Sequence, residues 1–158
     1  MKILVMDEET VEVYSSNEHS ETSVIISISS VRGRKAFIYD DVPRNNIKDI
    51  LYLSFDDEDD FKTGHNLMTH LDAAQIIDFT THWKNEGIDT LIVQCEYGES
   101  RSVAVAAALS EYFLNISLPE ELTENMNKHC YNRLKLWLDR RREYDVRKEY
   151  NIRWEGKS

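Results

Sequence analysis

The segment at residues 103–114 constrains the fold of this chain more than any other part of its sequence. It is rich in alanine and apolar on nearly all sides, so a helix formed here must be covered by other elements. The apolar run at residues 90–93 precedes it and has the length of a buried strand. A strand, a short loop and a buried helix in this order are typical of α/β proteins.

The rest of the chain also alternates between strand-like and helix-like segments. Strands are expected at residues 3–6, 23–31 and 50–55, and residues 36–39 have a weaker strand pattern. We therefore predict a single α/β domain over residues 1–158, with a central, mostly parallel sheet flanked by helices. In such sheets, ligands bind beyond the carboxyl ends of the strands.

Two further helices are indicated by apolar residues at helical spacing. The first stripe should end near Gly87, which suits a C-terminal cap, and it consists of Met68, Ile76, Phe79 and Trp83. The second stripe consists of Leu122, Met126, Cys130, Leu134 and Leu138. We expect this second stripe to be broken near residues 127–132, and we interpret Cys130 within it as a buried core thiol.

Charge and cysteine content limit the partners and the compartment. The 158 residues include 19 Lys and Arg against 29 Asp and Glu, a formal net charge of −10, which argues against nucleic acid and anionic membrane surfaces as partners. The longest apolar run falls well short of the ~20 residues that span a membrane. The N-terminus lacks the apolar region of a signal peptide. Two cysteines without metal-ligand spacing indicate a reducing compartment, so we expect a cytoplasmic protein.

The loop between residues 90–93 and the alanine-rich helix carries the candidate chemistry. Cys95 and Arg101 bracket five residues, and the start of the following helix would supply backbone amides and the positive end of its dipole to an anion of phosphate size. Gly98 allows close approach of the backbone, and Arg101 can grip two oxygens of the anion. The same cradle would stabilise a thiolate at Cys95, which is then aligned for in-line attack on a bound phosphate.

This loop, CEYGESRS at residues 95–102, resembles the signature loop of the cysteine-dependent protein tyrosine phosphatases, closest to their small dual-specificity branch. The family pattern is His-Cys-x-x-Gly-x-x-Arg followed by Ser or Thr. The resemblance covers residues 50–115 and implies a two-step phosphatase that needs no metal or other cofactor. It implies that Cys95 is the nucleophile, Arg101 the phosphate clamp and Ser102 the hydroxyl that eases departure of the thiolate. The other residues that would surround the phosphate are Glu96, Tyr97, Gly98, Glu99 and Ser100.

Cleavage of a phosphate ester also needs a proton for the leaving oxygen. The strand at residues 50–55 runs into an acidic stretch with four candidate acids: Asp56, Asp57, Asp59 and Asp60. In the family that the loop resembles, an aspartate on a separate loop supplies this proton. The likeness of LSFDD at residues 53–57 favours Asp57, with Asp56 as the second choice.

The loop sequence also bears on the substrate and on two competing interpretations. None of its variable positions is basic, and Glu96 and Glu99 would repel polyanions, so we expect a phosphorylated protein or peptide, mainly phosphotyrosine. Gln94 stands where the family has histidine and cannot carry charge, which would suit a non-catalytic protein that binds phosphorylated residues. The remaining alternative is another thiol enzyme, such as a rhodanese-type sulfurtransferase or an arsenate reductase.

Overall fold

The computed structural model describes residues 1–58 and 66–155, and within them the centre of the molecule is a four-stranded parallel sheet. The strands are β1 (Lys2–Met6), β2 (Ser23–Ser29), β3 (Ile47–Ser54) and β4 (Thr90–Gln94). They lie in the order β1-β4-β2-β3, and all three pairings are parallel. The carboxyl ends of all four strands therefore meet at one edge of the sheet.

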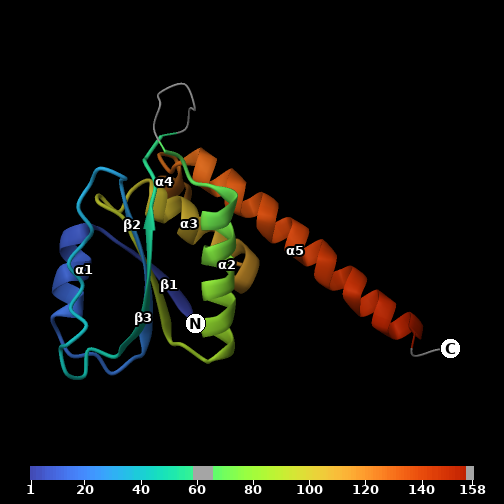
Figure 1. Ribbon diagram of the computed structural model, residues 1–158, viewed down its shortest axis with the longest axis horizontal. Coiled ribbons are helices and arrows are strands. Elements are labelled where there is room, and N and C mark those ends of the chain that lie inside the picture. The colour runs from blue at the N-terminus through green and yellow to red at the C-terminus, as the bar shows by residue number, and fades with distance from the viewer. Residues whose placement is uncertain (59–65, 156–158) are drawn as a thin grey trace.

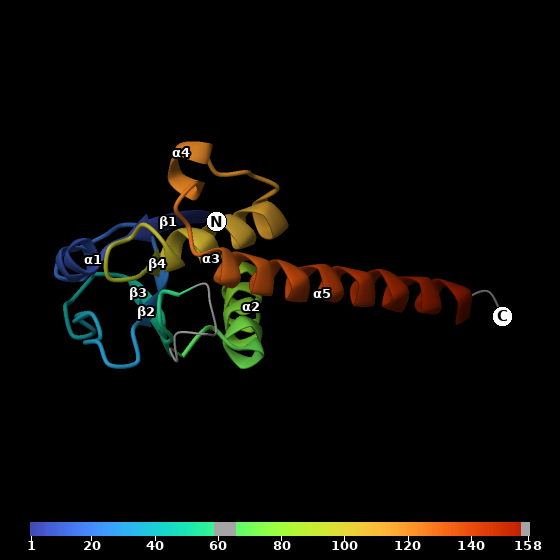
Figure 2. The same cartoon turned by 90° about the horizontal axis from the view of Figure 1, so that it is seen from above.

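Helices cover both faces of this sheet (Figure 1). Helix α1 (Glu8–Ser15) lies on one face, and α2 (His70–Asn85) and α3 (Arg101–Leu109) lie on the other. The short α4 (Glu120–Thr123) leads into α5 (Lys128–Glu155), whose first part packs on α2 and α3. Figure 2 shows that the rest of α5 extends beyond the body of the domain. The predicted α/β class with a parallel sheet is thus confirmed.

Two apolar clusters, one on each face, hold the helices to the sheet. Val24, Ile26 and Leu91 belong to the larger cluster, together with residues of α2, α3 and α5. Ile25 and Ile92, the alternate residues of the same strands, belong to the smaller cluster with Val11 of α1. Strands β2 and β4 are buried on both faces because their residues alternate between these clusters.

The alanine-rich helix occupies the position that its composition predicts. Every residue of α3 is buried, including Arg101 and Ser102. The helix continues as the π-helical segment η2 (Ser110–Leu114) and ends at Asn115, which has a left-handed backbone conformation. The chain thus enters α3 directly from the loop after β4, so a charged residue at its first turn is carried into the interior.

The other two helices follow their predictions in part. Met68 is buried but lies outside α2, which begins after Thr69 in a capping box with Asp72. The helix ends at Asn85, and Gly87 has a φ of +78°, as expected for a residue that follows a helix. The predicted break in the last stripe is present between α4 and α5, but it lies at residues 124–127, and residues 128–132 belong to α5. Leu122 was wrongly assigned to the core stripe, because it lies exposed on α4.

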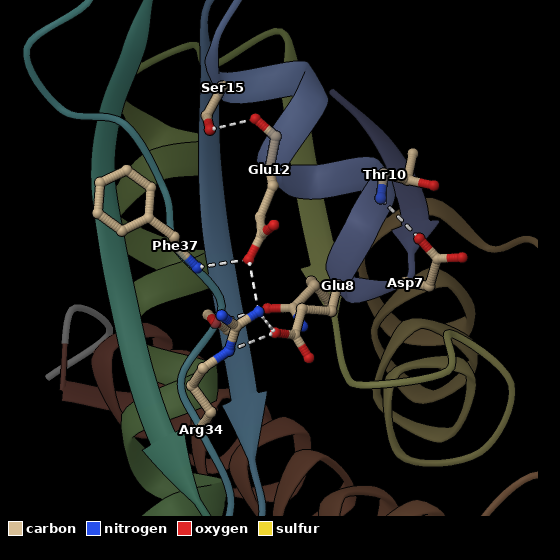
Figure 3. Close-up of polar contacts among 9 residues, drawn as sticks. Asp7, Glu8, Thr10, Glu12, Ser15, Arg34 and Phe37 are labelled. Atoms are coloured by element: carbon tan, nitrogen blue, oxygen red, sulfur yellow. Dashed lines mark hydrogen bonds and ion pairs between the residues drawn. The ribbon is translucent and has the colours of Figure 1, made fainter.

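The strand pattern at residues 36–39 does not form a strand. Ala36 and Ile38 are buried in the smaller apolar cluster, so the alternation is present. However, the backbone N–H of Phe37 donates to the Glu12 carboxylate of α1 at 3.1 Å, as Figure 3 shows. The Tyr39 N–H likewise donates to the Ser15 hydroxyl at 3.1 Å. Side chains of a helix here satisfy the backbone donors that a neighbouring strand would otherwise satisfy.

In the part of the chain that the structure describes, no helix is long and apolar enough to cross a membrane.

Candidate active site

Cys95 lies directly after β4, at the edge of the sheet where the four strands end. Residues 95–101, here called the Cys95 loop, connect it to α3. The Cys95 side chain is only 2 % exposed, and its Sγ lies 3.0 Å from the Oγ of Ser102 in the first turn of α3. A hydroxyl at this distance can donate to a thiolate, so the structure brings together two residues that the sequence placed in the site.

The Cys95 loop is held against the junction between β1 and α1. The Glu8 N–H donates to the Glu96 carbonyl at 3.1 Å. Gly98 has a φ of +66°, and a Cβ at this position would lie 2.9 Å from the Asp7 backbone nitrogen. Only glycine fits here without strain, because both the backbone conformation and the available space exclude a side chain.

The first turn of α3 presents uncapped amides to the loop. Ser100 occupies the N-cap position but makes no side-chain capping bond, because its hydroxyl instead donates to the Asp57 carboxylate at 2.7 Å. The amides at a helix N-terminus carry partial positive charge and bind anions when no side chain caps them. The loop therefore has an electropositive end next to Cys95.

Arg101 is buried at the start of α3, and one nitrogen of its guanidinium group is held by hydrogen bonds. Its Nη1 donates to the Phe55 carbonyl at 2.9 Å and to the Ser30 hydroxyl at 3.0 Å, which lie just beyond β3 and β2. Its Nε is buried and has no hydrogen-bond partner among the described residues. A buried cationic donor without an acceptor is costly, and an oxyanion in the loop would satisfy it. The sequence did not indicate the two anchoring groups, since they lie on distant segments.

The two leading candidates for the acid have different partners. The Asp56 carboxylate accepts hydrogen bonds from the backbone N–H groups of Val31 and Asn66, at 3.0 and 2.9 Å, and so ties loop segments together. Asp57 is exposed and contacts the Cys95 loop through Ser100. The other two candidates, Asp59 and Asp60, lie outside the described residues.

One residue that the sequence analysis missed also contacts Asp57. Asn127, just before α5, donates from its Nδ2 to the same carboxylate oxygen at 2.9 Å. An asparagine before a helix is a recognisable capping signal, but nothing in the sequence connects it to residues near position 57 or 100.

Gln94, which stands where the phosphatase pattern has histidine, is fully integrated into the sheet. It is buried, and its Oε1 accepts a hydrogen bond from the Ser27 hydroxyl of the adjacent β2 at 2.6 Å. This neutral pair fixes the end of β4 immediately before Cys95 and adds no charge to the site.

The mouth of the Cys95 loop is acidic. Glu96, Glu99 and Tyr97 are exposed, and Tyr97 is 71 % exposed. They border a groove that is also lined by Arg34, by Asp7 at the N-cap of α1, and by three residues of α1: Glu8, Glu9 and Glu12. Arg34 is itself paired with Glu8 and Glu12 (Figure 3). The groove therefore carries a net negative charge.

The second cysteine lies away from the loop chemistry. Cys130 is completely buried in the larger apolar cluster, as predicted for a core thiol. Both cysteines lie in the described part of the chain, and they form no disulfide. Among residues 1–58 and 66–155, no group of three or more His, Cys, Asp or Glu side chains is placed to hold a metal ion.

Comparison with known proteins gives matches in structure alone. No family profile and no curated protein matches the sequence. A human tyrosine phosphatase-like serine/threonine/tyrosine-interacting protein matches with a TM-score of 0.55 and 16 % identity, over 85 % of this chain and 89 % of that one. PTPMT1 matches with a TM-score of 0.55 and 16 % identity, over 92 % and 95 % of the two chains. Tk-PTP in its active form matches with a TM-score of 0.52 and 15 % identity, over 87 % and 90 %. The chain therefore has the fold of the cysteine-dependent protein tyrosine phosphatases, in a form similar to the dual-specificity branch.

Proposed function

We propose that the protein is a phosphoric monoester hydrolase that removes phosphate from phosphotyrosine side chains of proteins, with phosphoserine and phosphothreonine as further candidate substrates. In the first step the Cys95 thiolate attacks phosphorus, the bond from phosphorus to the leaving oxygen breaks, and Asp57 gives its proton to that oxygen. In the second step Asp57 takes a proton from water, the water oxygen bonds to phosphorus, and the S–P bond breaks. Inorganic phosphate leaves, and the thiolate is restored.

The observation that carries this proposal is the contact between Asp57 and the Cys95 loop. The 2.7 Å hydrogen bond from Ser100 to Asp57 joins a carboxyl group beyond β3 to the loop that begins at Cys95. A nucleophile, an anion cradle and a proton donor from separate segments are what phosphate-ester cleavage requires. Arg101, whose buried Nε has no hydrogen-bond partner in the described part of the chain, supports the cradle, and Ser102 supports a thiolate leaving group in the second step.

The acidic mouth supports a phosphorylated protein side chain over polyphosphorylated small molecules. Glu96 and Glu99 flank the loop, and a row of carboxylates on α1 borders the same groove. Each exposed carboxylate disfavours an additional phosphate by about 0.5–1 kcal/mol at low salt. The proposal includes a reducing, cytoplasmic setting, because Cys95 must stay reduced to attack phosphorus.

A second candidate is a protein that binds phosphorylated residues without hydrolysing them. Gln94 favours this alternative because it provides no charge beside the thiol. One structural neighbour is described as a phosphatase-like interacting protein. The position of Cys130 in the apolar core disfavours an arsenate reductase, which would need a resolving thiol near Cys95.

Hydrolysis of 4-nitrophenyl phosphate and of a phosphotyrosine peptide, by the wild type and by Cys95→Ser, separates these functions. We expect the wild type to release phosphate and Cys95→Ser to be inactive while keeping its fold. A wild type that binds vanadate but hydrolyses neither substrate would favour the binding protein. Unchanged activity in Cys95→Ser would exclude a thiolate mechanism.

The assignment of the acid is tested by two neighbouring variants. Asp57→Asn should lower kcat by roughly 10²-fold or more because the leaving oxygen loses its proton donor. Asp56→Asn should mainly lower the free energy of unfolding, since Asp56 accepts hydrogen bonds from Val31 and Asn66. A larger loss of kcat in Asp56→Asn than in Asp57→Asn would reverse the assignment.

A further inference from the structure

Asn127 lies where three segments of the candidate site meet. It is 2 % exposed and stands between α4 and α5. Its backbone N–H donates to the Ser100 carbonyl of the Cys95 loop at 3.2 Å. Its side-chain Nδ2 donates to Asp57 Oδ1 at 2.9 Å and to the Glu58 carbonyl at 3.3 Å. One buried residue therefore holds the Cys95 loop and the Asp57 segment together.

The other end of the same side chain fixes the start of α5. Asn127 Oδ1 accepts a hydrogen bond from the Cys130 N–H at 3.0 Å, which is the geometry of an N-cap. Because both the acceptor and the donor end of the amide are in use, the side chain has one orientation. The position of its Nδ2 is then set by α5, which packs on α2 and α3.

This arrangement gives the two oxygens of Asp57 different roles. Oδ1 accepts two hydrogen bonds, from the Ser100 hydroxyl at 2.7 Å and from Asn127 Nδ2 at 2.9 Å. The Asn127 Nδ2 can only donate, and the Ser100 hydroxyl also donates to Oδ1 in this geometry, so a proton on the carboxyl group is directed to Oδ2. The pair of donors thus orients the acid as well as holding its segment in place.

We infer that Asn127 is a positioning residue for the proton donor: it holds Asp57 so that Oδ2 carries the proton to the leaving oxygen. This inference rests on the proposed phosphatase function. Asn127 acts through Asp57 and need not touch the substrate. The inference predicts that loss of Nδ2 slows the step that needs the acid and leaves phosphate binding unchanged.

A variant that keeps the cap and removes the donor isolates this role. Serine and aspartate are both good N-cap residues. Asn127→Ser keeps an acceptor for the Cys130 N–H but is too short to reach Asp57, and Asn127→Asp keeps the cap but replaces the donor with a carboxylate. Asn132, exposed on the next turn of α5, provides the matched control Asn132→Ser.

The experiment compares kcat and KM for phenyl phosphate and 4-nitrophenyl phosphate in the full chain. Phenolate is the more basic leaving group, so its release depends more on the acid. We expect Asn127→Ser to lower kcat/KM, which reports the first step, about 10-fold or more for phenyl phosphate but less than about 3-fold for 4-nitrophenyl phosphate, with little change in the inhibition constant of inorganic phosphate. Asn132→Ser should match the wild type on both substrates. In a protein that already carries Asp57→Asn, Asn127→Ser should not change the ratio of activities on the two substrates any further.

The outcomes separate this inference from the function on which it rests. An active wild type in which Asn127→Ser loses the same factor in kcat/KM on both substrates, or loses nothing, would overturn the positioning role and leave the phosphatase intact. A wild type that hydrolyses neither substrate would overturn the proposed function itself. Urea unfolding checks that the cap is kept, and if Asn127→Ser is unfolded, the same substrate dependence is required of Asn127→Asp.

Discussion

Gly98→Ala tests whether the geometry of the Cys95 loop depends on close packing against the end of β1. A Cβ at residue 98 would lie 2.9 Å from the Asp7 nitrogen and 3.1 Å from the Met6 carbonyl carbon, whereas ordinary contact begins near 3.4 Å. Both neighbours are backbone atoms at the junction of β1 and α1, so neither can rotate away. The loop must therefore move by about 0.5 Å to accept the methyl group.

The chain offers a matched control in Gly87→Ala. Gly87 has a similar positive φ of +78°, but a Cβ there would have no atom of the described residues within 4 Å beyond its chain neighbours. The left-handed backbone should cost either alanine variant about 1–2 kcal/mol in the free energy of unfolding. Only Gly98→Ala adds the collision with the β1–α1 junction, so the difference between the two variants measures that collision.

The effect on the reaction should be larger than the effect on stability. Displacements of a reacting group by about 1 Å cost roughly 10²-fold in rate, so a shift of about 0.5 Å should lower kcat/KM for 4-nitrophenyl phosphate by about 10-fold or more. Gly87→Ala, at the end of α2, should keep the wild-type kcat/KM. Equal stability and full activity in both alanine variants would show that the loop is not held by the junction.

Two further predictions concern charge. The pKa of the Asp89 carboxyl is held below its usual value by hydrogen bonds from the Thr22 backbone N–H and hydroxyl. The contribution of these hydrogen bonds to the free energy of unfolding is therefore complete above about pH 4, and it is lost as the pH falls through the lower pKa of the folded state. In urea unfolding at several pH values, the stability advantage of the wild type over Asp89→Asn should shrink on acidification, and an advantage that stays constant to about pH 2 would contradict this linkage. Replacing Glu96 and Glu99 together by lysine should raise kcat/KM for an inositol polyphosphate relative to 4-nitrophenyl phosphate by about 10-fold at low salt. A ratio that does not change at low ionic strength would show that the mouth does not select against polyanions.

The fold was predictable where local pattern and burial agree. The apolar run of β4, the glycine in the loop and the all-apolar face of α3 together specified a strand, a tight loop and a buried helix, and each was found. The segment at residues 36–39 shows the limit of such patterns. Alternating burial was correct there, but the partner of the backbone N–H groups is Glu12 on α1, and alternation carries no information about which group accepts a hydrogen bond.

The acid illustrates a different limit. Asp56 and Asp57 are adjacent and chemically identical, so composition could not separate them, and the preference for Asp57 came from the resemblance. In the structure the Asp56 carboxylate accepts hydrogen bonds from the backbone N–H groups of Val31 and Asn66, and the Asp57 carboxylate accepts one from the Ser100 hydroxyl. Successive residues beyond a strand point in different directions, so the contacts of each depend on what the fold places on either side.

The contact of Asn127 with the candidate site could not be predicted from the sequence, and the reason also limits which residues can replace it. Its capping bond is local, but its bonds to Ser100 and Asp57 depend on how α5 packs against α2 and α3. The side chain at residue 127 must provide an acceptor that caps α5. At the same distance from the backbone, it must also provide a donor that reaches the Asp57 carboxylate. Serine caps but does not reach, aspartate caps but opposes the carboxylate, and glutamine is one methylene too long for an N-cap, so asparagine alone meets both requirements.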